Sequence, residues 1–161
     1  MRQSGPVVPP VRVKGVNAGG GAAGEFAADS GATEGSQFST TAAITGAGAV
    51  PAAVYQTERY GNFSYALTGL TPGGSYTVRL HFAEVYWGLA GRAGAGQRVF
   101  NVTVNGAAAL SNFDIFQEAG AANKALVKEV SATADAQGRI TVGFANVKNF
   151  AKVSGIEVFT R

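Results

Sequence analysis

The chain has 161 residues, 46% of them hydrophobic and 14% charged, so it is long enough for one domain with a substantial core and does not have the composition of a disordered chain. Its net charge is only +3 and its Lys and Arg residues are scattered singly, which argues against nucleic-acid binding. The absence of cysteine excludes disulfides, thiol nucleophiles and thiolate metal sites.

The N-terminal part of the chain indicates a linker followed by a first strand. Residues 1–10 contain Pro6, Pro9 and Pro10 without any periodic pattern, so we expect a linker there and a domain over residues 11–161. The segment 11–18 predicts a strand, and the glycines that follow it predict sharp turns and close backbone approach. Residues 25–54 show no sustained period, which predicts a mostly irregular loop with short strands that is a candidate part of a binding surface.

The clearest strand pattern lies at residues 75–84, where apolar and polar residues alternate with the period of two expected for a half-buried strand. The apolar side chains predicted to face the core are Tyr76, Val78, Leu80 and Phe82. The alternate residues, His81 among them, are predicted to lie on the sheet surface. Because turn residues 72–74 separate this strand from the apolar segment 63–70, the two are predicted to pair as a hairpin.

Later segments predict further strands, namely residues 97–106, 125–133, 138–147 and 153–160. The first of them ends at Asn105-Gly106, a strong turn signal. At least seven short strands are therefore predicted. Since a single sheet could not cover its own apolar face, the expected fold is an all-β antiparallel sandwich of two packed sheets with long loops.

Four ordered parts of the sequence carry a resemblance to a known family: Val16–Gly20 (VNAGG), Tyr55–Tyr60 (YQTERY), Leu80–Trp87 (LHFAEVYW), and Gln97–Val102 (QRVFNV) with Phe113–Ile115 (FDI). Together they resemble the malectin domain, which is also classed among carbohydrate-binding modules. The resemblance implies a sandwich of jelly-roll or galactose-binding type that acts as a lectin without enzymatic activity. Eukaryotic relatives bind glucose-terminated oligosaccharides, and bacterial relatives accompany glycoside hydrolases or other secreted polysaccharide-handling proteins.

From this resemblance we expect non-catalytic binding of a glucose-containing oligosaccharide or glucan. The alanine- and glycine-rich composition suits a bacterial version. An extracellular or cell-surface protein with a covalently linked catalytic domain is then the expected context. The sequence has no run of about 18 apolar residues, so no membrane span is predicted, and an export signal would lie outside this chain.

The resemblance also implies a set of ligand-binding residues: the rings of Phe38, Tyr60, Tyr86 and Trp87, with Asn149 at or near the position of the family's acid. An amide still forms hydrogen bonds with hydroxyls, but without the charge-assisted part. Gln56 or Glu58 is a further candidate for orienting the sugar. Rings of this kind suit a pyranose because they cover its apolar C–H faces, whereas polar groups bind its hydroxyl rim.

Catalysis and metal binding are the less favoured alternatives. A glycosidase would need two carboxylates, most plausibly from Glu58, Glu84 and Asp114, but non-catalytic relatives share the motifs that contain them. We expect Glu84 and Arg59 to form structural ion pairs or loop hydrogen bonds. With one histidine, no cysteine and no acidic cluster, no metal site and no cofactor are predicted, although a structural calcium held by loop carbonyls stays open.

A protein-interaction or adhesion module is the remaining alternative, because sandwich edges pair with extended peptides and the family also occurs in receptor ectodomains.

Overall fold

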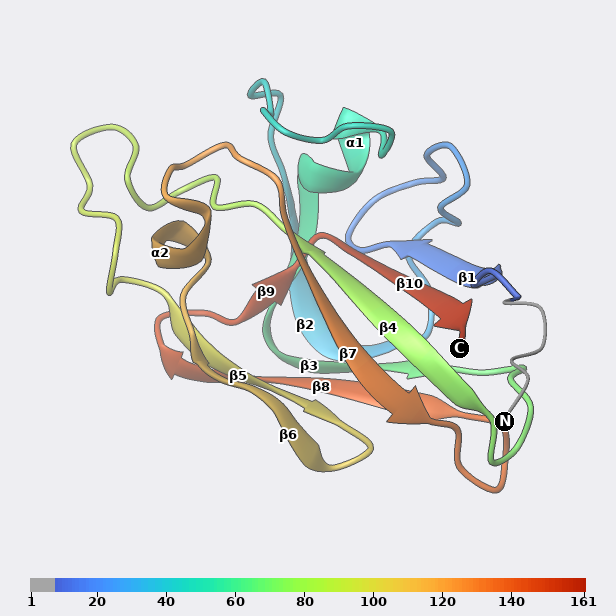
Figure 1. Cartoon of the computed structure of the whole chain (residues 1–161). Coiled ribbons are helices and arrows are strands. Elements are labelled where there is room, and N and C mark those ends of the chain that lie inside the picture. The colour runs from blue at the N-terminus through green and yellow to red at the C-terminus, as the bar shows by residue number, and fades with distance from the viewer. Residues whose placement is uncertain (1–7) are drawn as a thin grey trace, which may run out of the picture.

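The computed structural model describes residues 8–161, so most of the predicted linker, residues 1–7, lies outside the described residues. Within that range the chain forms ten strands and two one-turn helices (Figure 1). The strands are β1 (Arg12–Asn17), β2 (Ala32–Ser39), β3 (Thr57–Leu67), β4 (Ser75–Phe82), β5 (Val99–Val104), β6 (Ala107–Phe113), β7 (Leu126–Thr133), β8 (Ile140–Lys148), β9 (Lys152–Val153) and β10 (Gly155–Thr160). The helices are α1 (Ala52–Tyr55) and α2 (Ile115–Ala119). Across the described part of the chain, neither helix has the length and apolar character needed to cross a membrane.

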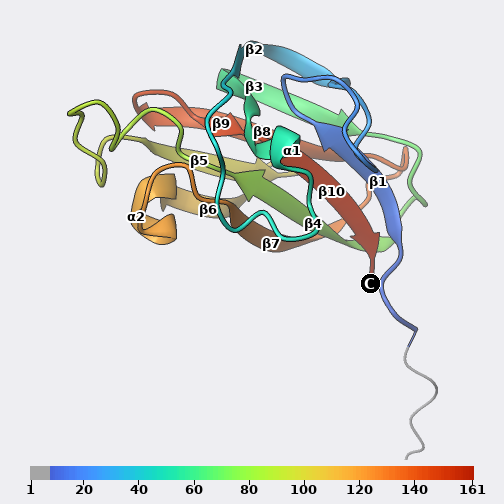
Figure 2. The same ribbon diagram turned by 90° about the horizontal axis from the view of Figure 1, so that it is seen from above.

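The strands form two antiparallel sheets that pack as layers, which Figure 2 shows from above. One sheet has the order β1-β10-β4-β7, and the other has the order β2-β3-β8-β5-β6 with β9 paired to β3. The predicted all-β sandwich is therefore confirmed. The long β4–β5 and β6–β7 connections lie together at one end of the sandwich, where the β4–β5 connection projects beyond both sheets in Figures 1 and 2.

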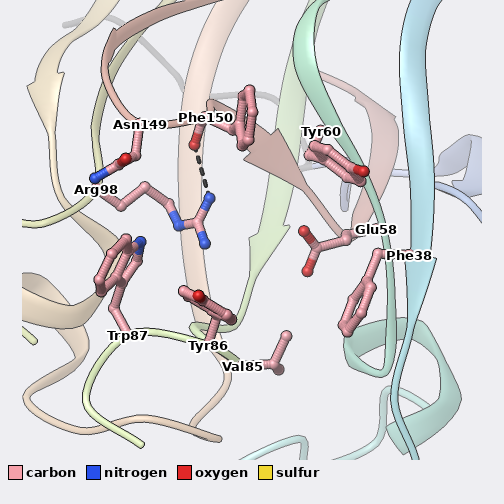
Figure 3. A pocket seen from close by; sticks show the side chains of 9 residues that line it. All are labelled: Phe38, Glu58, Tyr60, Val85, Tyr86, Trp87, Arg98, Asn149 and Phe150. Carbon is pink, nitrogen blue, oxygen red and sulfur yellow. Dashed lines mark hydrogen bonds between the residues drawn. The ribbon is translucent and has the colours of Figure 1, made fainter. Parts of the chain in front are cut away.

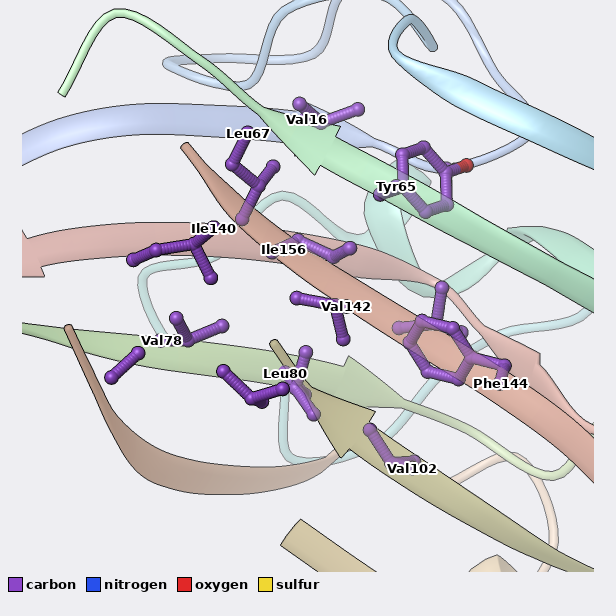
Figure 4. Packing of buried hydrophobic residues seen from close by; sticks show 14 of the residues in the cluster. Val16, Tyr65, Leu67, Val78, Leu80, Val102, Ile140, Val142, Phe144 and Ile156 are labelled. Atoms are coloured by element: carbon purple, nitrogen blue, oxygen red, sulfur yellow. The ribbon is translucent and has the colours of Figure 1, made fainter. Parts of the chain in front are cut away.

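The core lies between the two sheets. The four apolar side chains predicted to face inward from β4 are buried, and Val78 and Leu80 pack opposite residues of β8 such as Val142 (Figure 4). At the end of the sandwich that carries the long loops, three phenylalanines form a tight cluster, with ring centroids of Phe82 and Phe113 4.9 Å apart and those of Phe100 and Phe113 5.4 Å apart. This cluster anchors the strand ends from which those loops leave.

The predicted hairpin between residues 63–70 and 75–84 is wrong. β3 pairs with β2, β8 and β9, whereas β4 pairs with β10 and β7, so residues 68–74 carry the chain from one sheet to the other. The expected turn exists, with the Gly74 amide donating to the Thr71 carbonyl at 2.9 Å, but it does not decide which strand pairs with which. The hairpin signal at Asn105-Gly106 is confirmed, since this dipeptide joins β5 to β6 with positive φ at both residues.

His81 is buried, and the expectation that it lies on the sheet surface is wrong. Its Nδ1 lies 2.7 Å from the Tyr55 hydroxyl of α1, and its Nε2 lies 2.6 Å from a Glu157 carboxylate oxygen. Phe26 packs edge-on against the imidazole ring. The outer face of β4 is thus covered by Phe26, which lies in the stretch 25–54 that shows no period in the sequence, and by Tyr55, which directly follows that stretch.

Candidate functional site

A pocket of about 440 Å³ opens among the loops at this end of the sandwich (Figure 3). Its lining residues are Phe38, Glu58, Tyr60, Val85, Tyr86, Trp87, Arg98, Asn149 and Phe150. All six residues expected to bind a ligand therefore lie around one cavity. The other three were not predicted. Val85 and Arg98 lie inside the motif segments that carry the resemblance, and Phe150 directly follows Asn149.

One wall of the pocket is built from β2, β3 and the turn before β9. Tyr60 of β3 packs against Phe150, with ring centroids 5.3 Å apart. Phe38 of the edge strand β2 lies opposite Glu58 in the β2–β3 register and is 45% exposed, and Phe150 is 52% exposed. These exposed rings give the wall an apolar surface that solvent can reach.

The opposite wall is the turn that follows β4. Because β4 ends at Phe82, Tyr86 and Trp87 do not lie on a strand, so they need not point to opposite faces of a sheet as consecutive strand residues do. Tyr86 is 43% exposed and Trp87 is half-buried. The Arg92 guanidinium lies over the Tyr86 ring, 3.9 Å from its centroid. The turn thus presents two adjacent rings to the pocket.

The loop 88–97 supports this turn through α2. Gly88 and Gly94 pack so closely on the Phe116 ring that a Cβ atom at either position would collide with it. The Asp114 carboxylate, which caps α2, accepts a hydrogen bond from the Gly96 amide at 2.5 Å. The glycine-rich composition of the loop therefore serves close packing around an aromatic side chain.

Two buried ion pairs lie beneath the pocket. Lys152 Nζ binds Glu58 Oε1 at 2.7 Å, and Arg98 Nε binds Glu84 Oε1 at 2.7 Å. Burial alone would raise the pKa of Glu84, but the positive charges of Lys152 and Arg98, together with hydrogen bonds, outweigh it and hold that pKa below its usual value. Glu84 is therefore ionised at neutral pH.

The structural role expected for Glu84 and Arg59 agrees with their contacts. Glu84 is 0% exposed and binds Arg98, while Arg59 Nη2 binds the Asp29 carboxylate at 2.7 Å. The same carboxylate accepts a hydrogen bond from the Tyr65 hydroxyl at 2.6 Å. Neither Glu84 nor Arg59 lines the pocket.

Asn149 occupies the rim in the left-handed region, with φ of 57°, a conformation that asparagine tolerates better than most residues. Its Nδ2 donates to the Gln97 carbonyl at 2.6 Å, which fixes the orientation of the amide. Its Oδ1 has no hydrogen-bond partner among residues 8–161, so it is free to accept a hydrogen bond from a ligand.

The VNAGG motif supports the pocket from behind. Gly19 has a φ of 75° and approaches the Glu58 backbone so closely that a Cβ atom would clash with it. Thr57 Oγ1 donates to Asn17 Oδ1 at 2.8 Å and joins the same two segments. The predicted close backbone approach of the glycine-rich segment is confirmed at this point.

Of the three candidate catalytic carboxylates, Glu58 is the one that lines the pocket. Glu84 and Asp114 are buried outside the lining, where Glu84 binds Arg98 and Asp114 binds the Gly96 amide. Among residues 8–161 there is no group of three or more His, Cys, Asp and Glu side chains that could hold a metal ion.

Solved structures with a similar fold have low sequence identity to this chain. The plant receptor-like kinase FER superimposes with a TM-score of 0.81 at 18% identity, covering 94% of this chain and 50% of that one. A Bacteroides uniformis beta-glucuronidase gives a TM-score of 0.72 at 18% identity, covering 92% of this chain and 18% of that one. These likenesses show the fold alone.

Relatives in sequence are closer. The kinesin-like protein KIN-14E of Oryza sativa is 31% identical over 153 residues, which cover 88% of this chain and 14% of that protein. Malectin-B of Xenopus laevis is 39% identical over 69 residues, which cover 42% of this chain and 23% of that protein. The chain thus spans a small part of the relatives that it matches. The family model of the malectin domain matches residues 13–157, and the chain therefore belongs to the malectin domain family.

Proposed function

We propose that this domain binds glucose-containing oligosaccharides or glucans in the pocket of Figure 3 and does not catalyse their hydrolysis. One observation carries the proposal: aromatic rings from four separate segments, namely β2, β3, the turn after β4 and the turn before β9, converge on one cavity. Soluble domains seldom leave several large rings together on one surface without a ligand for them. Membership of the malectin domain family points the same way.

The chemistry of the lining suits a sugar. The rings provide apolar surface for the C–H faces of a pyranose. They lose little conformational entropy on binding because aromatic side chains are rigid and have few rotatable bonds. Asn149 and Glu58 supply hydrogen-bonding groups at the rim and at the floor. A few polar groups around an apolar surface is the usual composition of a small-molecule site.

The absence of catalysis is proposed from the carboxylates. Glycoside hydrolysis needs two carboxyl groups that flank the scissile bond. Glu58 is the carboxylate that lines this pocket, where buried Lys152 binds it at 2.7 Å, and the described lining residues include no second carboxyl group to complete such a pair.

We further propose that the domain is a module of a larger secreted protein, a bacterial glycoside hydrolase or another polysaccharide-handling protein, with the catalytic domain covalently linked. The small share of each relative that the chain spans supports the modular part. The occurrence of the fold in a receptor extracellular domain supports the proposed secretion, and its occurrence in a bacterial beta-glucuronidase supports the proposed link to a glycoside hydrolase. The relatives in sequence are from plants and Xenopus, so this setting is tested by the domains that accompany the module in its full-length protein.

Protein recognition is the second candidate, because one solved structure with this fold contains the plant peptide RALF23 in complex with FER and LLG2. A protein-binding domain would leave the pocket unaffected by glycans.

A glycan array followed by calorimetry distinguishes the two functions. Trp87 is the single tryptophan of the chain and lines the pocket, so its fluorescence reports on occupancy. We expect gluco-oligosaccharides to change the Trp87 emission and to be recovered intact, without new reducing ends. Failure of every glycan to bind would refute the proposal, and release of reducing ends would refute its non-catalytic part.

A further inference from the structure

Four charged side chains lie buried in a group beneath the pocket, and they join the segments that form its walls. They are Glu58 of β3, Glu84 after β4, Arg98 before β5 and Lys152 of β9, and each is at most 6% exposed. We propose that this buried charge group sets the positions of the pocket rings before any ligand binds, and that Glu84 is its central positioning residue. The inference rests on the proposed sugar-binding function for its effect on affinity, but not for its effect on the ligand-free pocket.

The spacing along the chain supports the proposal. Three of the pocket rings lie two residues from a member of the buried charge group: Tyr60 from Glu58, Tyr86 from Glu84, and Phe150 from Lys152. A shift of any one charge would therefore move the backbone that carries a ring.

Glu84 holds one wall directly. Its Oε2 accepts hydrogen bonds from the backbone amides of Tyr86 at 3.1 Å and Trp87 at 3.2 Å. The two residues that supply the rings of the post-β4 turn are thus bound to one buried carboxylate. Glu84 does not itself line the pocket, so its contribution acts through these amides.

Arg98 extends this connection to the opposite wall. Its guanidinium binds Glu84 through Nε at 2.7 Å and Nη2 at 3.2 Å, and its Nη1 donates to the Phe150 carbonyl at 2.7 Å (Figure 3). A continuous run of hydrogen bonds thus crosses the floor from the Trp87 amide to Phe150. The planar fork of arginine suits this because it binds a carboxylate and a carbonyl together in fixed geometry.

Energetics favour a role in binding over a role in folding. Desolvation of a buried ion pair offsets most of its Coulombic attraction, so such pairs add little net stability. By contrast, the rings of Phe38, Tyr86 and Phe150 are 45%, 43% and 52% exposed, so burial alone does not fix their positions. Fixing them in advance reduces the entropy that binding must remove, which raises affinity.

The test is Glu84→Gln, with Glu157→Gln as the matched control. Glutamine keeps the shape and one acceptor oxygen of glutamate but removes the charge that holds Arg98. Glu157 is also buried, at 5% exposed, and binds Arg12 Nε at 2.7 Å, but its ionic partners Arg12, Arg79 and His81 do not line the Figure 3 pocket. We measure acrylamide quenching of Trp87 without ligand, affinity for a gluco-oligosaccharide by calorimetry, and the melting temperature.

In the Glu84→Gln variant we expect stronger quenching of Trp87 and an affinity lower by about tenfold, because the rings must be ordered during binding. In Glu157→Gln we expect the quenching of Trp87 and the affinity to match those of the wild type. This should hold even if its melting temperature falls as much as that of Glu84→Gln. Should Glu84→Gln not fold, Arg98→Lys keeps the buried charge and loses the fork, and we expect it to increase quenching in the same way.

Wild-type quenching in a folded Glu84→Gln or Arg98→Lys variant would overturn the proposal, as would an equal change in the control. If the wild type binds no glycan, the proposed function fails while the quenching comparison still decides whether Glu84 positions the rings.

Discussion

The rings of Tyr86 and Trp87 meet edge to face, with centroids 4.9 Å apart and planes at 90°. Two adjacent rings at a right angle form a corner, and edge-to-face contact is a favourable arrangement for aromatic pairs. The Arg92 guanidinium covers Tyr86 from 3.9 Å. A sugar in this pocket would therefore contact the two rings on different sides, and loss of either would remove one side of the corner.

Tyr86→Ala should lower the affinity for gluco-oligosaccharides by about tenfold, a typical cost for truncating an aromatic anchor. Because the Tyr86 side chain is 43% exposed, the melting temperature should change little. Val127→Ala is the control, since Val127 has the same exposure but lies on β7, outside the pocket. Calorimetry of the three proteins decides the matter, and full affinity in Tyr86→Ala would remove Tyr86 from the site.

Asn149→Gly should weaken sugar binding severalfold while leaving the fold intact. Glycine adopts the positive φ of 57° at this position without strain, so the change removes the amide, together with its hydrogen bond to the Gln97 carbonyl, without straining the backbone. The lost group is one neutral hydrogen-bonding partner, which corresponds to about 1 kcal/mol. Asn123→Gly is a suitable control because Asn123 also has a positive φ, 53°, and does not line the pocket. Equal affinity in the two variants would contradict a role for the Asn149 amide.

Gly88→Ala should destabilise the protein more than Gly91→Ala. Both glycines have positive φ, 83° and 78°, so both substitutions carry the backbone strain of about 1 kcal/mol expected for alanine in that region. Only at Gly88 does the added methyl group meet the Phe116 ring, since no atom lies within 4 Å of a Cβ at Gly91. Urea denaturation measures the difference. Equal free energies of unfolding would show that loop 88–97 can move away from Phe116 without losing stability.

The parts of the fold that depend on local alternation could be predicted, and the parts that depend on distant segments could not. The buried face of β4 follows from its own period of two. Whether the turn at residues 72–74 makes a hairpin depends instead on β8 and β10, which come much later in the chain. β8 pairs with β3 and β10 pairs with β4, so β3 and β4 do not pair with each other. The burial of His81 likewise depends on Tyr55 and Glu157, one on each side of it in sequence.

The candidate site shows the same division. The five residues expected from the family resemblance, and Glu58 with them, do surround one pocket, although their binding role is a prediction still to be tested. Phe150 could have been found, because an aromatic residue beside Asn149 in a polar turn is a signal in itself. The pairing of Lys152 with Glu58 could not, since the two lie 94 residues apart and nothing local connects them.

Acid should destabilise this protein through Asp29. Burial alone would raise the pKa of Asp29, but hydrogen bonds from Tyr65, Gln37 and Arg59 outweigh it and hold the pKa below its usual value. A carboxyl group whose pKa is depressed on folding stabilises the folded state above the unfolded pKa of about 4, and this contribution is lost as the pH falls through the folded pKa. Glu84 and Glu157 shift in the same direction and add to the effect.

Asp29→Asn should therefore be less stable than the wild type at pH 7 and should lose less stability as the pH falls below about 4, because one of the linked protons no longer binds. Urea denaturation from pH 7 to pH 3 measures how the free energy of unfolding of each protein changes with pH. Glu25→Gln is the control, since it also replaces one carboxylate by an amide, but at a side chain that is 84% exposed. An Asp29→Asn protein with the wild-type acid slope would mean that the ionised Asp29 does not stabilise the fold, and that its bonds to Arg59 and Tyr65 contribute no more than neutral ones.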